Sequence, residues 1–256
     1  MRGGCFRCPA GSTVKDLKKQ YVFGPVLSRR LGKSLGVDVF PEKICNYDCI
    51  YCELGRTKKR CPAAGDCLPV AAVVEAVKER LREIAQPDYI TLYGPGEPTL
   101  HKCIGEIIAG IRKISKGPVA LLTNGSLFWM DEVRRAVLNA DLIIPSLDAG
   151  GAETFEAVDR PTADITFEKM VEGLVALRRD FRRPIWLEVF LVEGITSGED
   201  EVRRIKQYVD LIKPDRIQLN TVDRPAAEPH VRALPRQRLK EIAVLLGPAC
   251  EVISRD

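Results

Sequence analysis

The chain has 256 residues, of which 45% are hydrophobic and 29% charged, and its formal net charge is +4. This length fits a single large domain, and no run reaches the roughly 18–20 apolar residues that a membrane span requires. The first residues lack the apolar core of a signal peptide, and nine cysteines indicate metal or redox chemistry rather than disulfides. We therefore expect a cytoplasmic protein without a membrane partner. Its mild positive charge permits a nucleic-acid partner but does not require one.

Residues 1–34 are expected to form an N-terminal extension that carries a C-x2-C pair, Cys5 and Cys8. Arg29, Arg30 and Lys33 lie at its end, just before the first predicted strand. We expect these basic residues to border the mouth of a site for an anionic substrate. Basic pairs inside helical patterns, such as Arg134-Arg135, are expected to be solvated.

Short β-rich runs then alternate with longer amphipathic ones. The predicted strands are Leu35–Phe40, Tyr89–Tyr93, Val119–Thr123, Leu142–Leu147, Ile185–Val192 and Arg216–Asn220. The predicted helices between and after them are Val70–Ala85, Ile104–Ile114, Asp131–Leu138, Phe167–Phe181 and Glu199–Ile212. Right-handed β–α units of this kind predict an α/β fold, a partial (β/α)6 TIM-like barrel with a single parallel curved sheet and outer helices. The core would span 35–220, and 221–256 would add a helix, Arg236–Leu246, and a tail, Cys250–Ile253, all in one domain over 1–256.

Three cysteines follow the first predicted strand with C-x3-C-x2-C spacing: Cys45, Cys49 and Cys52, with Tyr51 just before the last thiol. Three thiolates can hold three irons of a four-iron, four-sulfur (4Fe-4S) cluster and leave the fourth iron open to a ligand. The alternative is a zinc knuckle or a cysteine-rich structural loop. Zinc usually takes a second close pair of ligands at knuckle spacing, and none follows at once. The spacing therefore favours the cluster.

A second basic group, Arg56-Lys58-Lys59-Arg60, follows the triplet and is also expected at the mouth of the site. Cys61 and Cys67 come next. Together with Cys5 and Cys8 they make two pairs that could hold a second iron–sulfur cluster or a zinc ion. The alternative is that all four are independent reduced thiols.

Polar residues stand where several predicted strands end, which is where parallel barrels place their catalytic groups. The second strand leads into Gly96-Glu97-Pro98, the third into Thr123-Asn124, the fourth into Ser146 and Asp148, and the sixth into Asn220. Glycine lets the backbone approach a ligand closely, and Glu97 offers a carboxylate to an ammonium group. Glu188 lies inside an otherwise apolar strand, so it is either paired inside the barrel or functional.

The cysteine triplet with Tyr51 and the Gly96-Glu97-Pro98 turn resembles the signature of radical S-adenosylmethionine (radical SAM) enzymes, over about residues 23–220. The resemblance implies that the triplet binds the 4Fe-4S cluster. It implies that Tyr51 lies by the adenine of SAM, and that Gly96 and Glu97, beside Pro98, meet the methionyl amino group. It also implies further SAM contacts along the strand ends, from Thr123, Asn124, Ser146, Asp148, Glu188 and Asn220. One electron from a flavodoxin- or ferredoxin-type donor would split SAM, and the resulting 5′-deoxyadenosyl radical would abstract hydrogen from the substrate.

Within that superfamily the chain resembles the wyosine-synthase-like group, which acts on tRNA. The similarity rests on Ser146-Leu147-Asp148-Ala149, on Asp159-Arg160-Pro161 and on the segment from Gly24 to Arg30. The chain departs from that group in having two rather than three N-terminal cysteines, and no lysine is assigned to condensation with pyruvate. Two alternatives stay open: a radical SAM enzyme that acts on a peptide, protein or small metabolite, and a non-catalytic metal-binding module.

Overall fold

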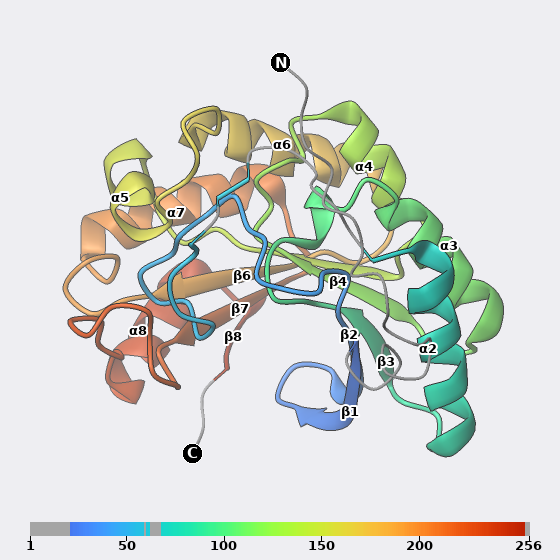
Figure 1. The fold of residues 1–256 in the computed structure, drawn as a ribbon. Coiled ribbons are helices and arrows are strands. Elements are labelled where there is room, and N and C mark those ends of the chain that lie inside the picture. Colours follow the sequence, from blue (N-terminus) through green and yellow to red (C-terminus); the bar gives the residue numbers. More distant parts are fainter. Residues whose placement is uncertain (1–20, 59, 62–67, 254–256) are drawn as a thin grey trace.

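The computed structural model describes residues 21–58, 60–61 and 68–253, and Figure 1 shows their arrangement. Cys5, Cys8, Lys59 and Cys67, which were named above, lie outside the described residues. Within the described part of the chain, no helix is both long enough and apolar enough to span a membrane.

A curved, mostly parallel sheet forms the centre of the molecule, with helices on its outer face (Figure 1). Five strands pair in chain order: β1 (Val22–Ser28), β2 (Gly32–Val37), β3 (Tyr89–Leu92), β4 (Val119–Thr123) and β5 (Leu142–Pro145). Three more follow as β6 (Trp186–Leu191), β7 (Arg216–Thr221) and β8 (Cys250–Val252). All neighbouring pairs are parallel except β1 with β2. The predicted α/β barrel-like fold is confirmed, and its six predicted strands correspond to β2–β7.

The sheet is less continuous than predicted between β5 and β6. Only isolated bridges, Ile143 with Ile185 and Ser146 with Glu188, join the two parts of the sheet there. β5 ends at Pro145, which has no N–H to donate to the neighbouring strand, so a regular ladder cannot pass through this position.

The helices that follow the strands are α2 (Val70–Glu83), α3 (Ile104–Ile114), α4 (Asp131–Val137), α5 (Ala152–Val158), α6 (Phe167–Asp180), α7 (Glu199–Ile212) and α8 (Arg236–Leu246). A short 3-10 helix, η1 (Pro98–Leu100), follows the turn after β3. α3 shows why periodicity located these helices well: Ile104, Ile107, Ile108 and Ile111 share one face, and all four are buried. At the start of α6 the Thr166 hydroxyl accepts a hydrogen bond from the Lys169 backbone N–H at 3.3 Å.

Four elements were not predicted: β1, α5, the 3-10 helix η1, and the strand β8, whose residues were expected to form a tail. β1 is an edge strand that exposes Val26 and Leu27 and contains Gly24-Pro25, so it lacks a clear alternation of buried and exposed residues. α5 has seven residues, too few to show a helical period clearly. The proposed boundary at residue 34 falls inside β2, which starts and ends three residues earlier than predicted. Val39 and Phe40 are buried beyond its end, because burial alone does not distinguish a strand from a packed loop.

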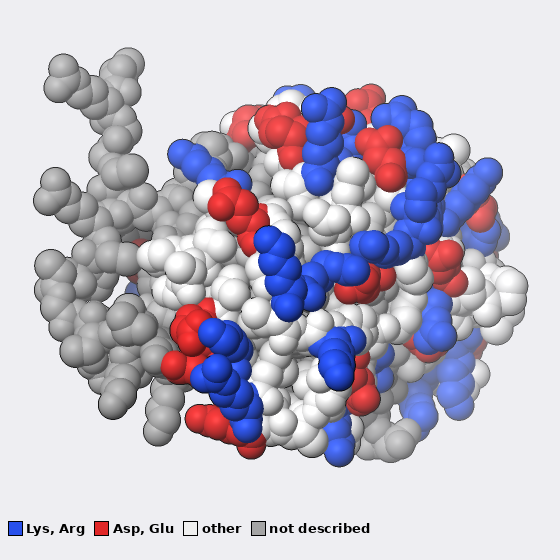
Figure 2. All heavy atoms as spheres, turned by 90° about the vertical axis from the view of Figure 1, so that its right-hand side faces the viewer, with Lys and Arg blue, Asp and Glu red and all other residues white. Residues whose placement is uncertain are grey.

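Basic and acidic side chains are interleaved over helices α2–α4, on the face shown in Figure 2. Arg80 pairs with Glu83 at 2.9 Å there, and Arg112 pairs with Asp141. The expectation that the Arg134-Arg135 pair is solvated is wrong for Arg134, which is 7% exposed. Its guanidinium donates to the Phe128 carbonyl and to Asp180, each at 2.7 Å, because it faces the interior side of α4.

Candidate functional site

The three cysteines lie on a loop, residues 41–61, which we call the cysteine loop and which follows β2. Backbone hydrogen bonds tie it to the turn after β3: Ile44 N–H donates to the Pro95 carbonyl at 2.8 Å, and Glu97 N–H donates to the Ile44 carbonyl at 2.9 Å. Its middle is tied to the end of α5, where Ile50 N–H donates to the Val158 carbonyl at 2.9 Å. The loop is therefore held by segments distant in sequence.

Each thiol is partly buried and has a different neighbour. The Cys45 sulfur accepts from the Tyr47 N–H at 3.4 Å, and the Cys49 thiol donates to the Asp159 carboxylate at 3.3 Å. The Cys52 sulfur accepts from the Lys43 ammonium at 3.1 Å. Burial raises the pKa of the Cys45 thiol to about 12, and burial together with the Asp159 charge raises that of Cys49. Binding of a metal through these sulfurs would therefore release protons from the thiols.

Three cysteine sulfurs on one loop are the donor set that iron–sulfur clusters use. Among the described residues, no three His, Cys, Asp or Glu side chains gather closely enough to hold one metal ion. The chemistry of the three thiols, which lie within one short stretch of the loop, fits such a cluster.

The cysteine loop packs so closely on the turn after β3 that only glycine fits at position 96. Its φ is +148°, and a Cβ at this position would lie 1.7 Å from the Ile44 carbonyl oxygen. Any side chain would therefore push the segment just before Cys45 away. The close approach that the sequence predicted for Gly96 is made to the protein's own backbone.

Glu97 is 1% exposed, and its carboxylate accepts four hydrogen bonds from the chain itself. One oxygen accepts from the Thr99 N–H at 2.9 Å and from the Thr99 and Thr123 hydroxyls at 2.5 and 2.6 Å. The other accepts from the Asn124 N–H at 2.6 Å. Burial raises the pKa of Glu97, and these hydrogen bonds partly offset that rise. Glu97 thus joins the turn after β3 to the end of β4.

Tyr51 and Asp148 meet beside a third group, Asp159. The Tyr51 hydroxyl donates to Asp148 and lies 3.2 Å from an Asp159 oxygen, while its ring stacks on Phe190 at 4.1 Å between centroids. Asp148 also accepts from the Phe190 N–H at 2.8 Å. Burial raises the pKa of Asp159 to about 7, and burial and the Asp159 charge raise that of Asp148. Two buried carboxyl groups therefore adjoin Cys49.

The side-chain amide of Asn220 on β7 donates to the Glu188 carboxylate on β6 at 3.1 Å. The other Glu188 oxygen pairs with Arg30 at 2.7 Å, which raises the pKa of that arginine. Glu188 is therefore paired with Arg30 and Asn220, and its contact with SAM stays a prediction.

Three of the basic residues expected at the mouth are paired with acidic ones. Arg29 pairs with Asp223 at 3.0 Å, and Arg56 pairs with Asp48 at 2.8 Å and also with Glu228. Arg30 pairs with Glu188, as described above. These arginines do not form an open cationic surface.

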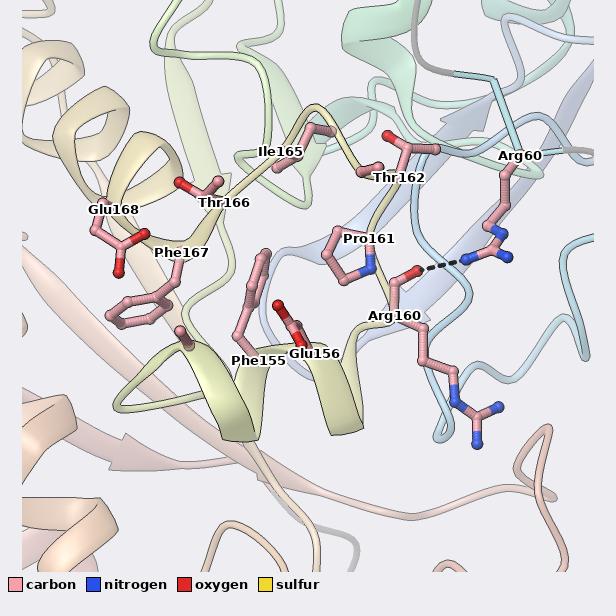
Figure 3. A pocket seen from close by; sticks show the side chains of 12 residues that line it. Arg60, Phe155, Glu156, Arg160, Pro161, Thr162, Ile165, Thr166, Phe167 and Glu168 are labelled. Carbon is pink, nitrogen blue, oxygen red and sulfur yellow. Dashed lines mark hydrogen bonds between the residues drawn. The ribbon is translucent and has the colours of Figure 1, made fainter.

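A pocket of about 720 Å³ lies along the segment 159–166, apart from the site residues at the strand ends (Figure 3). Phe155 and Phe167 line one side of it, and Arg60 and Arg160 the other, where Arg60 donates to the Arg160 carbonyl at 3.3 Å. None of the predicted SAM contacts lines this pocket. It borders the cysteine loop through Arg60, and the segment that lines it is tied to the same loop, because the Thr162 N–H donates to the Asn46 carbonyl at 2.9 Å.

All the predicted site residues that the structure describes thus lie on the cysteine loop or at the strand ends, apart from Glu188, which is inside β6. Cys61 is also on this loop, with its N–H bonded to the Cys45 carbonyl at 3.0 Å. The sequence did not predict that Lys43, Asp159 and Phe190 lie next to the cysteines and Tyr51. Lys43 stands two residues before Cys45, a proximity that could have indicated it. Nothing in the sequence pairs Asp159 or Phe190 with this loop.

Comparison with known proteins gives matches along most of the chain. The family model of the Radical SAM superfamily matches residues 40–209. A Brachyspira hyodysenteriae protein named GTPase Obg is 42% identical over 240 residues, which are 94% of this chain but 35% of that protein. A UPF0026 protein of Methanocaldococcus jannaschii is 30% identical over 236 residues, covering 91% of this chain and 72% of that protein. The chain therefore spans about a third of the first relative and most of the second.

The solved structure of TYW1 with a lysine–pyruvate adduct bound has a similar fold. The TM-score is 0.64 at 14% sequence identity, and the match covers 90% of this chain and 76% of that one. At this identity the likeness concerns the fold.

Proposed function

Because this chain belongs to the radical SAM superfamily and to the UPF0026 family, we propose that it is an enzyme that cleaves SAM at a 4Fe-4S cluster bound by Cys45, Cys49 and Cys52. The observation that carries the proposal is the cysteine loop, which presents three sulfurs beside the polar strand ends. A cluster with one open iron, once reduced by one electron, supplies the chemistry that splits SAM into methionine and a 5′-deoxyadenosyl radical, which takes hydrogen from the substrate.

The chain's own residues divide into two groups in this proposal. Glu97, Thr123 and Asp148 already have partners in the protein, so we assign them to holding the strand ends in place. Ser146 is partly exposed at the same edge, and we assign a direct SAM contact to it first. Asn124 is also partly exposed there and stays a proposed contact, although its side chain donates to Asn46 at 2.9 Å and accepts from the Ser126 N–H at 3.0 Å. Tyr51 is pre-oriented by its stack on Phe190, which supports a place beside the adenine. Gly96, Pro98, Glu188 and Asn220 remain proposed contacts.

Anaerobic reconstitution with iron and sulfide tests the function. We expect about four irons per chain at the triplet and 5′-deoxyadenosine after reduction with dithionite in the presence of SAM. Cys49→Ala should abolish the product, whereas Cys250→Ala, which changes a thiol on β8, should not. A wild-type protein that loads iron and binds SAM but forms no 5′-deoxyadenosine would refute the catalytic proposal. Bound zinc and no iron would favour the non-catalytic metal-binding module.

The substrate to test first is a tRNA base. The fold shared with TYW1 supports this choice, and a peptide, protein or small metabolite is the alternative. Binding of tRNA should weaken steeply as salt rises, because phosphate contacts release counterions. The internal pairs of Arg29, Arg30 and Arg56 leave fewer free cations for such contacts, so a small salt dependence would favour the alternative substrates.

We also propose a cytoplasmic location, a flavodoxin- or ferredoxin-type electron donor, and a second iron–sulfur or zinc site made by Cys61 with Cys5, Cys8 and Cys67. The position of Cys61 beside Cys45 supports the second site, and the other three residues lie outside the described part of the chain. Metal analysis of Cys61→Ser tests it. Loss of iron or zinc beyond that held by the triplet is expected, and unchanged metal content would refute it.

A further inference from the structure

A lysine contacts one of the three cysteine sulfurs and has no role in the proposal so far. The Lys43 ammonium lies 3.1 Å from the Cys52 sulfur and also donates to the Gly55 carbonyl. Lys43 precedes the triplet and Gly55 follows it, so one side chain connects the segments on the two sides of the triplet. This contact joins residues nine apart in sequence, and the fold of the loop creates it.

The charges around the three sulfurs are uneven. Cys52 faces the Lys43 cation, Cys49 faces the Asp159 carboxyl group, and Cys45 faces the Tyr47 N–H and, at 3.8 Å, the Asn124 amide. Lys43 therefore provides the charged hydrogen-bond donor in this set. Since it is partly buried, water and salt screen its charge less than they screen that of an exposed lysine.

A positive donor at a ligand sulfur affects electron uptake. A cluster gains one negative charge when it is reduced, and hydrogen bonds to its sulfurs and the local net charge set its potential. A charge-assisted hydrogen bond strengthens as the negative charge on its acceptor increases. We infer that Lys43 raises the reduction potential of the cluster bound through Cys52, and that it is a positioning residue for electron entry rather than a catalytic one. This inference rests on the proposed cluster.

The test is a redox titration of the reconstituted protein, followed by the electron paramagnetic resonance signal of the reduced cluster, without SAM or substrate. At a fixed poise, Lys43→Met should lower the ratio of reduced to oxidised cluster about tenfold, a shift of about 59 mV to more negative potential for one electron. Lys43→Arg should stay close to the wild type. Lys58→Met is the matched control, because it removes the same charge from an exposed position of the same loop.

Each outcome tests either the proposed function or the inference about Lys43. Absence of a cluster from the wild type refutes the proposed function itself. A cluster that forms in all variants, with Lys43→Met shifted no more than Lys58→Met, overturns the inference and leaves the function standing. Lys43→Gln keeps a donor without the charge, so a wild-type potential in this variant also overturns the inference. If neither neutral variant loads iron while Lys43→Arg does, Lys43 only holds the loop, and the tuning role is overturned.

Discussion

Replacing Glu97 with glutamine tests how the turn after β3 is fastened to the end of β4. The two carboxylate oxygens each accept from a backbone N–H, that of Thr99 at 2.9 Å and that of Asn124 at 2.6 Å. A glutamine amide has one oxygen, so either orientation places its NH2 group against one of these N–H groups. The Thr99 and Thr123 hydroxyls can rotate and accept instead, but a backbone N–H cannot.

The expected cost follows from this geometry. One buried N–H is left without an acceptor, which costs about 1–3 kcal/mol, and the remaining bonds lose the charge that strengthened them. We expect Glu97→Gln to lower the free energy of unfolding by about 2–4 kcal/mol. For a chain of this size, that corresponds to a melting temperature lower by roughly 5–10 °C.

The assay is thermal and urea unfolding of cluster-free protein under reducing, anaerobic conditions. Glu75→Gln is the control, because Glu75 lies on α2 with a half-exposed side chain that pairs with Lys78 at 3.2 Å. It should change stability by no more than about 0.5 kcal/mol. A Glu97→Gln protein as stable as this control would refute the reasoning that Glu97 fastens the two strand ends.

Three further perturbations test other parts of the site and fold. Gly96→Ala should lose most of its reconstituted iron, because its Cβ meets the Ile44 carbonyl. Gly198→Ala is the control and should keep its iron, because its φ is −66° and its Cβ meets open space; equal iron contents would contradict this. Asp159 holds a proton in the native state up to about pH 7, whereas an unfolded aspartate loses its proton near pH 4. Stability of the cluster-free protein should therefore fall as pH rises from about 4 to 7, by at most about 1.4 kcal/mol per pH unit, and Asp159→Asn should flatten this slope in melting curves. Arg134→Met should cost about 1–3 kcal/mol, because it leaves the buried Phe128 carbonyl without its donor, while urea unfolding of Arg135→Met should match the wild type.

The helices were easier to predict than the strands. α3, α7 and α8 begin and end where periodicity predicted, because each buries one face and periodicity is a local property. β2 was displaced by three residues, because its limits depend on pairing with β3 between Ser34 and Val37. β1 depends even more on a partner, since its own sequence exposes most of its side chains.

The sequence by itself determined the cysteine triplet and the order of the strand ends around it. Spacing along the chain is covalent, so C-x3-C-x2-C holds whatever the fold does. Only the tertiary structure decided which groups the site residues meet. Glu97 turned out to be enclosed by Thr99, Thr123 and Asn124, and Cys49 to face Asp159, 110 residues away. Arg30 forms an ion pair with Glu188, and the Lys43 ammonium donates to the Cys52 sulfur. Such contacts depend on distances that packing sets, and packing is a property of the whole chain rather than of any segment.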